Sequence, residues 1–320
     1  MNKFSICLDI GGTKVLGAIF DENQEIVFRL KKKTRVKEGM QNVEDTIVSV
    51  VSELLTGYGI TMEDVEAIAA GAPGVINQDT GVVLFAPNLP WENYEIERIL
   101  EARFGKPFYI GNDVNIGVYG EWKYGAARGL TNVVGLFIGT GMGGGLILDG
   151  RLYTGNDCKG AELGHMVLNT EGPRCNCGQR GCLEAFSSKI GMVDYIQQQI
   201  RRGRTTVMAD AISDGVFKSK AMKAAYEAND PVMIEAIDRA CQYLAVASGS
   251  LVNIFSPQMI VFGGGVMEAL GDVFLARILR YVDAYCLPSI RNTVVFSKAE
   301  LNDDSILYGA LALIHEKQNK

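Results

Sequence analysis

Short apolar runs, separated by glycine-rich or polar turns, dominate the first thirty residues. Residues 3–10 (KFSICLDI), 15–20 (VLGAIF) and 25–30 (EIVFRL) are apolar and β-prone, and Gly11-Gly12-Thr13 and the polar stretch 21–24 separate them. Runs of this length between turn residues are typical of strands. The pattern therefore predicts a three-stranded β-meander at the start of the chain.

The same pattern returns later in the chain. Residues 133–138 (VVGLFI), a glycine turn over 139–145, residues 146–148, an Asp149-Gly150 turn and residues 151–153 follow one another. Asp-Gly is a preferred type I′ hairpin turn. The two glycine turns begin 128 positions apart, at Gly11 and Gly139, which is too long a period for a solenoid. Because all five elements recur in order, the pattern favours two related lobes made by duplication over a coincidence of common turns.

Helical and strand-like patterns alternate in the remaining sequence. Residues 41–57 place apolar side chains at helical spacing, and 231–254 and 306–317 also have a helical pattern, the last after the expected cap 303–305. Residues 67–76 and 106–113 read as strands, the second leading into a helix over 114–125. Residues 259–266 read as a strand that ends in glycines. This alternation predicts an α/β protein.

Composition excludes several classes of function. The 320 residues are 48% hydrophobic with a net charge of −6, which suits two globular domains and disfavours nucleic acid as a partner. No segment has the ~20 consecutive apolar residues of a membrane span, and Asp9 interrupts any signal-like core. We therefore expect a cytoplasmic protein, in which clustered cysteines stay reduced. Cys7, Cys241 and Cys286 are expected to be core residues.

Three glycine sites are candidates for holding a nucleotide. Glycine lets backbone N–H groups approach a phosphate, and a threonine adds a hydroxyl donor. An ordinary β-turn is the alternative for the first site, in which Asp9 could also hold Mg²⁺ through water, and tight strand–helix packing is the alternative for the third. The first site comprises Asp9, Gly11, Gly12, Thr13 and Lys14, the second Gly139, Thr140 and Gly141, and the third includes Gly264.

Asn112 and Asp113 lie between a predicted strand and a predicted helix. A carboxylate held there by rigid elements could accept a proton from a substrate hydroxyl. The alternative is that Asp113 caps the helix, and it could do both.

The most specific pattern is Cys175-x-Cys177-x₄-Cys182 with His165 ten residues before it. Three thiolates and one imidazole make a closed tetrahedral set for a structural Zn²⁺, and a thiol-redox site is the rival. Zinc on one imidazole nitrogen would orient the other toward a ligand. Glu162 and Glu184 bracket this loop and could accept hydrogen bonds from hydroxyls. The alternative of solvated surface charges is weaker for Glu162, which stands among small and apolar residues.

Together these motifs resemble those of the ROK family of sugar kinases and repressors. The matching pieces are DIGGTK, GAPGVI, APNLPW, GNDVN, FIGTGMGGG, GAELGH, CNCGQRGCLE and FGGGV, in the family's order. The resemblance implies a two-lobed actin/hexokinase-like fold of the ribonuclease H-like, duplicated kind, with a central cleft. It implies an N-terminal lobe of residues 1–117 plus 305–320, and a C-terminal lobe of 118–304 with the zinc-binding loop 160–184. Homodimers or homotetramers are common in such kinases.

The resemblance also implies roles for single residues. Asp113 looks like the general base, and Gly74, Asn88, Asn112, Glu162, His165 and Glu184 resemble the sugar-binding set. His165, Cys175, Cys177 and Cys182 match the zinc ligands. Gly11, Gly12, Thr13, Thr140 and Gly141 match the phosphate loops, and Gly264 the adenosine site.

The resemblance therefore implies ATP- and Mg²⁺-dependent phosphorylation of a hexose at its primary hydroxyl. Glucose is the first expectation and N-acetylmannosamine the second, with fructose and allose as further family substrates, and the donor, ATP or polyphosphate, stays open. A sugar-responsive repressor would need a helix-turn-helix, for which the start of the first glycine loop at Asp9 leaves no room. A catalytically dead sensor is disfavoured by the intact Asp113 and glycine loops.

Overall fold

The computed structural model describes residues 3–34, 39–213 and 217–319, with Met40 described by its backbone alone. These residues form two compact units. The first unit comprises residues 1–129, 152–160 and 304–320, and the second comprises 130–151 and 161–303. The boundary implied after residue 117 lies inside helix α3 (Asp113–Lys123). The units instead divide at Gly129, because α3 packs as a whole on the C-terminal helix.

The first unit is built on a five-stranded sheet. Its strand order is β3-β2-β1-β4-β8, with β1, β2 and β3 antiparallel and β1, β4 and β8 parallel. A small antiparallel sheet, β5-β6-β7, belongs to the same unit. The strands are β1 (Phe4–Ile10), β2 (Lys14–Phe20), β3 (Ile26–Lys33), β4 (Val65–Ala72), β5 (Val75–Asn77), β6 (Val82–Phe85), β7 (Glu92–Tyr94) and β8 (Phe108–Asn112), and the helices are α1 (Met40–Tyr58), α2 (Ile96–Phe104), α3 and α11 (Ser305–Gln318).

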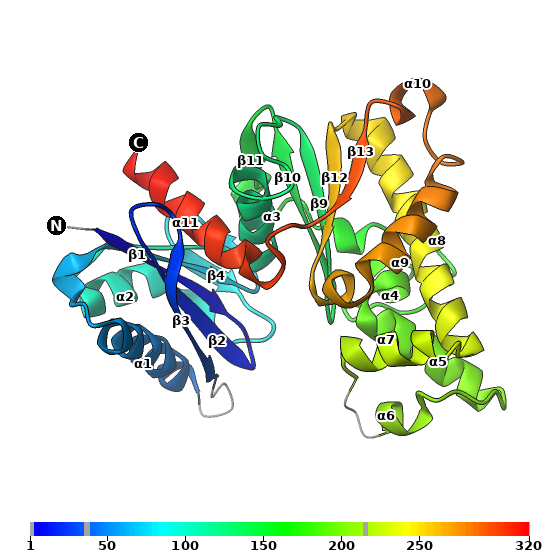
Figure 1. Ribbon diagram of the computed structural model, residues 1–320, viewed down its shortest axis with the longest axis horizontal. Helices are drawn as coiled ribbons and strands as arrows, with labels where there is room; N and C mark the ends of the chain where they lie inside the picture. The colour runs from blue at the N-terminus through cyan, green and yellow to red at the C-terminus, as the bar shows by residue number, and fades with distance from the viewer. Residues whose placement is uncertain (1–2, 35–38, 214–216, 320) are drawn as a thin grey trace. The chain divides into compact units, whose positions relative to one another are not determined.

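Helices cover both faces of this sheet (Figure 1), which explains why β1, β2 and β4 are almost continuously buried. Ile6 and Leu8 pack in the core beneath α1, while Cys7, between them, packs in the core beneath α11. All three are fully buried. Burying each larger side chain stabilises the unit by about 1.5–3 kcal/mol.

The helix that begins at Asp113 is locked onto α11 by glycines. A Cβ at Gly309 would lie 1.8 Å from the carbonyl oxygen of Ile116, and one at Gly120 would lie 2.2 Å from that of Ser305. Only glycine permits this approach. The Ser305 hydroxyl also donates to the buried Glu121 carboxylate at 2.9 Å, whereas the expected capping hydrogen bond at the start of α11 is absent from the described residues. Asp113 therefore stands on a rigid element.

A second sheet has the corresponding order, β11-β10-β9-β12-β13, and its strands β9, β10, β12 and β13 belong to the second unit. Again the central strand, β9, is antiparallel to β10, and β12 runs parallel to β9 and β13. The strands are β9 (Val133–Ile138), β10 (Met142–Leu148), β11 (Arg151–Tyr153), β12 (Met259–Gly263) and β13 (Val295–Lys298). The α-helices are α4 (Leu183–Ser187), α5 (Lys189–Arg201), α6 (Ala209–Ser213), α7 (Ser219–Glu227), α8 (Pro231–Phe255), α9 (Gly265–Val282) and α10 (Pro288–Arg291), and the short 3₁₀ turns of the two units are Met62–Asp64, Asn156–Cys158, Leu163–His165 and Asn302–Asp304.

The matching strand orders confirm the predicted α/β class and agree with the predicted duplication. Two details differ from the sequence analysis. Strand β10 begins at Met142, so that Gly143, Gly144 and Gly145 lie inside a strand and not in a turn. Glycine is required inside the strand at position 144 by packing, because a Cβ there would lie 2.5 Å from the Leu163 side chain. The strand predicted over 259–266 ends at Gly263, since α9 begins at Gly265.

One apolar core serves the second unit, and α8 and α9 contribute most of its helical part. Cys241 and Cys286 are buried in it, and Cys7 in the first unit, as predicted. Within the part of the chain that is described, no helix is both long and apolar enough to cross a bilayer.

Candidate functional site

The predicted residues of the first unit gather at the edge where its parallel strands end. The register pairs Asp9 with Gly71 and Gly71 with Gly111, so that Asp113 follows two residues beyond this row. Strands lie about 4.8 Å apart, which puts β1 and β8 about 10 Å apart across β4. Carboxyl ends of parallel strands are the usual place for ligands in open α/β sheets.

The first glycine turn is tight and meets a second predicted segment. The Gly11 N–H donates to the Lys14 carbonyl at 2.8 Å, and the Thr34 hydroxyl donates to the Gly11 carbonyl at 2.7 Å. A Cβ at Gly12 would lie 2.8 Å from the Asn88 carbonyl oxygen. The turn therefore needs glycine at this position and brings Asn88 beside it, while Thr13 is exposed to solvent.

Asn112 ties two predicted sugar-binding positions together. Its side-chain N–H donates to the Gly74 carbonyl at 3.0 Å, and its side-chain oxygen accepts from the Asn115 N–H at 3.0 Å. Gly74 has a φ of 116°, a left-handed value that favours glycine. Asn112 is thus the N-cap of α3, and the alternative that Asp113 is the cap is wrong.

Asp113 is the first residue of α3 and is half-buried. One of its carboxylate oxygens accepts from the Val114 N–H at 2.9 Å. The positive end of the helix dipole favours the ionised carboxylate at this position. The second oxygen of an ionised carboxylate has lone pairs of its own, so the geometry suits a group that accepts a proton from a hydroxyl.

The second unit carries the other two glycine sites. In the turn Gly139–Gly141, the Gly139 N–H donates to the Gly141 carbonyl at 2.9 Å, and Thr140 is exposed. Gly264 has a φ of 86°, and a Cβ there would lie 2.7 Å from the Ile138 carbonyl oxygen. Gly264 therefore stands against the end of β9, close to where this turn begins.

A cavity of about 150 Å³ opens beside Gly264. Sequence reasoning missed its other lining residues, among them Met267, Lys298 and Asn302. Their position at the end of a parallel strand is the signal that could have identified them. Lys298 ends β13, which runs parallel to β12, and the carboxyl ends of neighbouring parallel strands share one edge.

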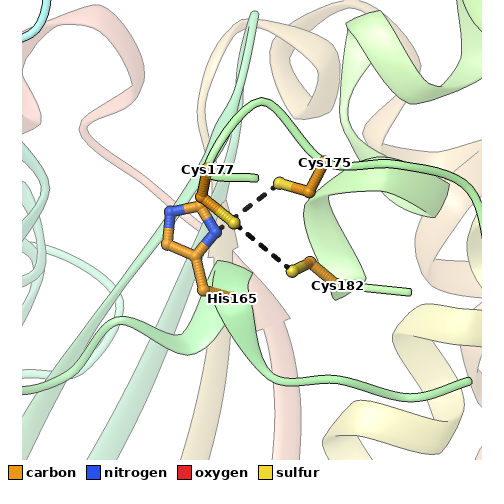
Figure 2. A group of neighbouring side chains, drawn as sticks. All are labelled: His165, Cys175, Cys177 and Cys182. Atoms are coloured by element: carbon orange, nitrogen blue, oxygen red, sulfur yellow. Dashed lines mark hydrogen bonds between the residues drawn. The ribbon is translucent and has the colours of Figure 1, made fainter. Parts of the chain in front are cut away.

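The four predicted metal ligands come together in the second unit (Figure 2). Their ligand atoms all lie within 4.8 Å of one another. The His165 Nδ1 lies 3.7 Å from the Cys175 Sγ, and the Cys177 Sγ lies 3.7 Å from the Cys182 Sγ. Figure 2 shows the other imidazole nitrogen, Nε2, on the side of the ring away from the sulfurs.

These distances fit a tetrahedral zinc ion. Zn–S bonds of about 2.3 Å place the ligand atoms at the corners of a tetrahedron about 3.8 Å apart. Burial raises the pKa of the Cys175 thiol, so that metal binding must displace its proton. Three sulfurs and one nitrogen would fill all four positions, as in structural zinc sites.

The two glutamates have different surroundings. Glu162 is exposed, so the sequence argument that it is the less solvated of the two is wrong. The half-buried Glu184 accepts a hydrogen bond from the Met142 N–H at 2.8 Å, and its other oxygen lies 3.3 Å from the Cys175 Sγ. This link between the metal loop and β10 is invisible to sequence spacing, because 42 residues separate its ends.

Two sheets of the same strand order, each with a glycine turn after its central strand, define a two-domain actin-like kinase fold. A model of the ROK family matches residues 5–317. The chain therefore belongs to the ROK family.

The relatives of the chain include enzymes and repressors. A glucokinase of Thermotoga maritima is 33% identical over 314 residues, which cover 98% of this chain and 97% of that enzyme. The crystal structure of a ROK family glucokinase from Streptomyces griseus in complex with glucose and AMPPNP is similar with a TM-score of 0.83, at 29% identity over 97% of this chain and 98% of that one. A xylose repressor of Caldicellulosiruptor bescii is 26% identical and matches 91% of this chain and 72% of the repressor.

Proposed function

We propose that the protein is an ATP-dependent hexose kinase that phosphorylates glucose at its primary hydroxyl. The observation that carries this proposal is the placement of Asp113, on a helix locked by glycines, at the sheet edge that also bears Asp9 and the first glycine turn. Asp113 would take the proton of the sugar hydroxyl, a role that typically gives about 10²–10⁴-fold in rate. The similarity to proteins named glucokinase supports the substrate class.

Phosphoryl transfer depends on positioning and on neutralising charge, with little covalent chemistry for the protein to perform. The N–H groups of the two glycine turns would hold the phosphates of ATP, with the Thr13 and Thr140 hydroxyls as further donors. Asp9 would hold Mg²⁺ through water, and the ion would neutralise phosphate charge. The cavity beside Gly264 would take the adenosine.

The sugar would be held by the hydrogen-bonding groups that resemble the family's sugar-binding set. Asn88, Asn112 and the backbone at Gly74 would contribute from the first unit, and Glu162, His165 and Glu184 from the second. A Cβ at Gly74 would lie 2.3 Å from the Phe85 carbonyl oxygen and 2.8 Å from the Ala86 Cα. This packing holds the Gly74 backbone in place, while the similarity to proteins named glucokinase favours glucose over N-acetylmannosamine.

The metal would be structural. With four protein ligands it has no open position for a substrate or water, so its role would be to fix the loop and the His165 ring. Through Nδ1 on the metal, the Nε2–H would be directed outward as a donor to a sugar hydroxyl. We also expect a homodimer or homotetramer, which light scattering of the purified protein would test.

An assay of ATP consumption against a panel of sugars tests the proposal. We expect turnover with glucose that exceeds turnover with N-acetylmannosamine, fructose or allose, and polyphosphate serves as the alternative donor in a parallel series. Asp113→Asn should keep the fold and metal content of wild type but lose at least about 100-fold in kcat. Asp79→Asn is the matched control, because Asp79 is exposed in a turn of the same unit.

Two results would contradict the proposal. Near-normal kcat in Asp113→Asn would remove the base assignment. Tight sugar binding by wild type without ATP consumption would instead support a sugar-responsive regulator, the second candidate, which the similarity to the xylose repressor favours.

A further inference from the structure

The Glu184 carboxylate contacts two segments that belong to different candidate sites. Its Oε2 accepts from the Met142 N–H at 2.8 Å, at the end of the glycine turn Gly139–Gly141. Its Oε1 lies 3.3 Å from the Cys175 Sγ of the metal cluster. Hydrogen bonds to an ionised acceptor are roughly twice as strong as neutral ones.

The segment that follows Glu184 holds the same glycine turn from its other side. The Lys189 N–H donates to the Gly139 carbonyl at 3.1 Å, and the Ile190 N–H donates to the Thr140 carbonyl at 3.2 Å. Both donors lie in the first turn of α5, directly after α4, and the Ser188 N–H donates to the Glu184 carbonyl at 3.0 Å. The turn is thus held through its carbonyls by α5 and through the Met142 N–H by Glu184.

Two further contacts show how closely the carboxylate is seated. Met142 is only 6% exposed, so its N–H would be left without a partner in a buried place if the carboxylate were removed. A Cβ at Gly141 would lie 2.6 Å from the Glu184 Oε2. Any side chain at position 141 would therefore push the carboxylate off its hydrogen bond.

The position of Glu184 depends in turn on the metal loop. Cys182, one of the four ligands, is the N-cap of α4, two residues before Glu184. The Leu183 N–H donates to the Met166 carbonyl at 2.9 Å, next to the ligand His165. A metal ion that fixes Cys182 and His165 therefore fixes the start of α4 on both sides.

We propose that Glu184 is a positioning residue that holds the turn Gly139–Gly141 in its phosphate-binding shape, and that the metal cluster sets the position of Glu184. This proposal rests on the proposed function, in which that turn binds the donor phosphates. It adds a role to the sugar contact implied by the family resemblance, because each carboxylate oxygen has two lone pairs. Its consequence is that the metal controls affinity for the nucleotide and not only for the sugar.

The test compares Glu184→Ala and Glu184→Gln with a matched control, Glu171→Ala, which removes an exposed glutamate from the same loop. All are measured zinc-loaded and without sugar. Glu184→Ala should speed hydrogen exchange at the Met142 amide by at least about tenfold and weaken AMPPNP binding about tenfold. Glu184→Gln should stay within about threefold of wild type in both, because its amide oxygen still accepts from Met142. Glu171→Ala should match wild type.

Chelation tests the metal part of the proposal. Removal of zinc should weaken AMPPNP binding to wild type but add little to the loss in Glu184→Ala, since the link is already broken. Gly141→Ala, which keeps Glu184 but displaces it, should also speed exchange at Met142.

Wild-type exchange at Met142 in Glu184→Ala would overturn the positioning role, and additive effects of chelation and mutation would overturn its dependence on the metal. Failure of wild type to bind AMPPNP would refute the proposed function, while exchange at Met142 would still decide whether Glu184 holds the turn.

Discussion

Gly164 lies between the predicted ligand His165 and Leu163, and we expect that even a methyl group there would disrupt the candidate metal site. A Cβ at Gly164 would lie 2.0 Å from the Met142 carbonyl oxygen, and such contacts essentially never fall below 3.0 Å. Gly164→Ala therefore forces the segment 163–165 and β10 apart by about 1 Å. Neither can yield easily, because the clash is with backbone and Leu163 is packed against Gly144.

The magnitude follows from two requirements. Metal–ligand distances must hold to within about 0.2 Å, so a shift of about 1 Å removes His165 from the ligand set. Overpacking alone typically costs about 1–3 kcal/mol, and the backbone clash puts this variant at the upper end. A loss of about 3 kcal/mol lowers the melting temperature of a unit of this size by about 6–12 °C.

Elemental analysis and thermal unfolding, with and without chelator, measure both effects. Gly164→Ala should hold well under one zinc per chain and melt about 6–12 °C below chelator-treated wild type, and lower still relative to zinc-loaded wild type. Gly265→Ala is the matched control, because nothing lies within 4 Å of its Cβ and its φ is not left-handed. It should keep its zinc and its melting temperature. A Gly164→Ala protein with full zinc content and wild-type melting would show that the segment 163–165 is not packed on β10 in this way.

Two further predictions concern stability. Burial raises the pKa of Glu97 to about 7, against an opposing effect of Lys317, so the folded protein holds a proton that the unfolded chain releases near pH 4.5. Stability should therefore fall as pH rises from about 5 to 7. At pH 8, the free energy of unfolding of Glu97→Gln, measured in urea, should exceed that of wild type by about 1–2 kcal/mol, a modest gain because the side chain is partly exposed. A variant with the stability of wild type at pH 8 would contradict this. Cys177→Ala should lose zinc and bind glucose more weakly, and chelator should lower the melting temperature of wild type but not of this variant; full zinc content in the variant would refute the ligand assignment.

The sequence predicted the elements whose ends carry strong turn signals. Both β-meanders and helix α8 were predicted, because glycine turns, the Asp149-Gly150 hairpin and an apolar face of helical period are local features. The φ values of 48° at Asp149 and 69° at Gly150 agree with the predicted type I′ turn. Helix α9 was not predicted from the sequence, because glycines precede it and Leu270 interrupts its helical geometry with a φ of −133°.

In the candidate site, too, local features could be predicted from the sequence and tertiary contacts could not. The cluster of four candidate metal ligands could be predicted from spacing, because residue type and order already define a tetrahedral set. Contacts made through backbone atoms could not. Asn88 beside Gly12, and Glu184 on the Met142 N–H, join segments far apart in the chain and depend on how sheets and loops pack. Tertiary contacts of this kind leave no periodic trace in the sequence.

The loop that carries the predicted metal ligands has little apolar packing of its own. Between His165 and Cys182 its regular pairing consists of two isolated bridges, Val167 with Cys182 and Arg174 with Arg180. Its own buried apolar cluster comprises Cys175, Cys182 and Ala185, and Met166 and Leu168 pack against the main core of the second unit. This small apolar surface has to offset the entropy of ordering the loop. A structural zinc ion contributes about 10–16 kcal/mol in small peptides, which is the scale the loop needs. A single ion would then order the loop, orient the His165 ring and place Glu184 against β10. Under the proposed function, one loop would thereby position groups for both the sugar and the phosphate donor.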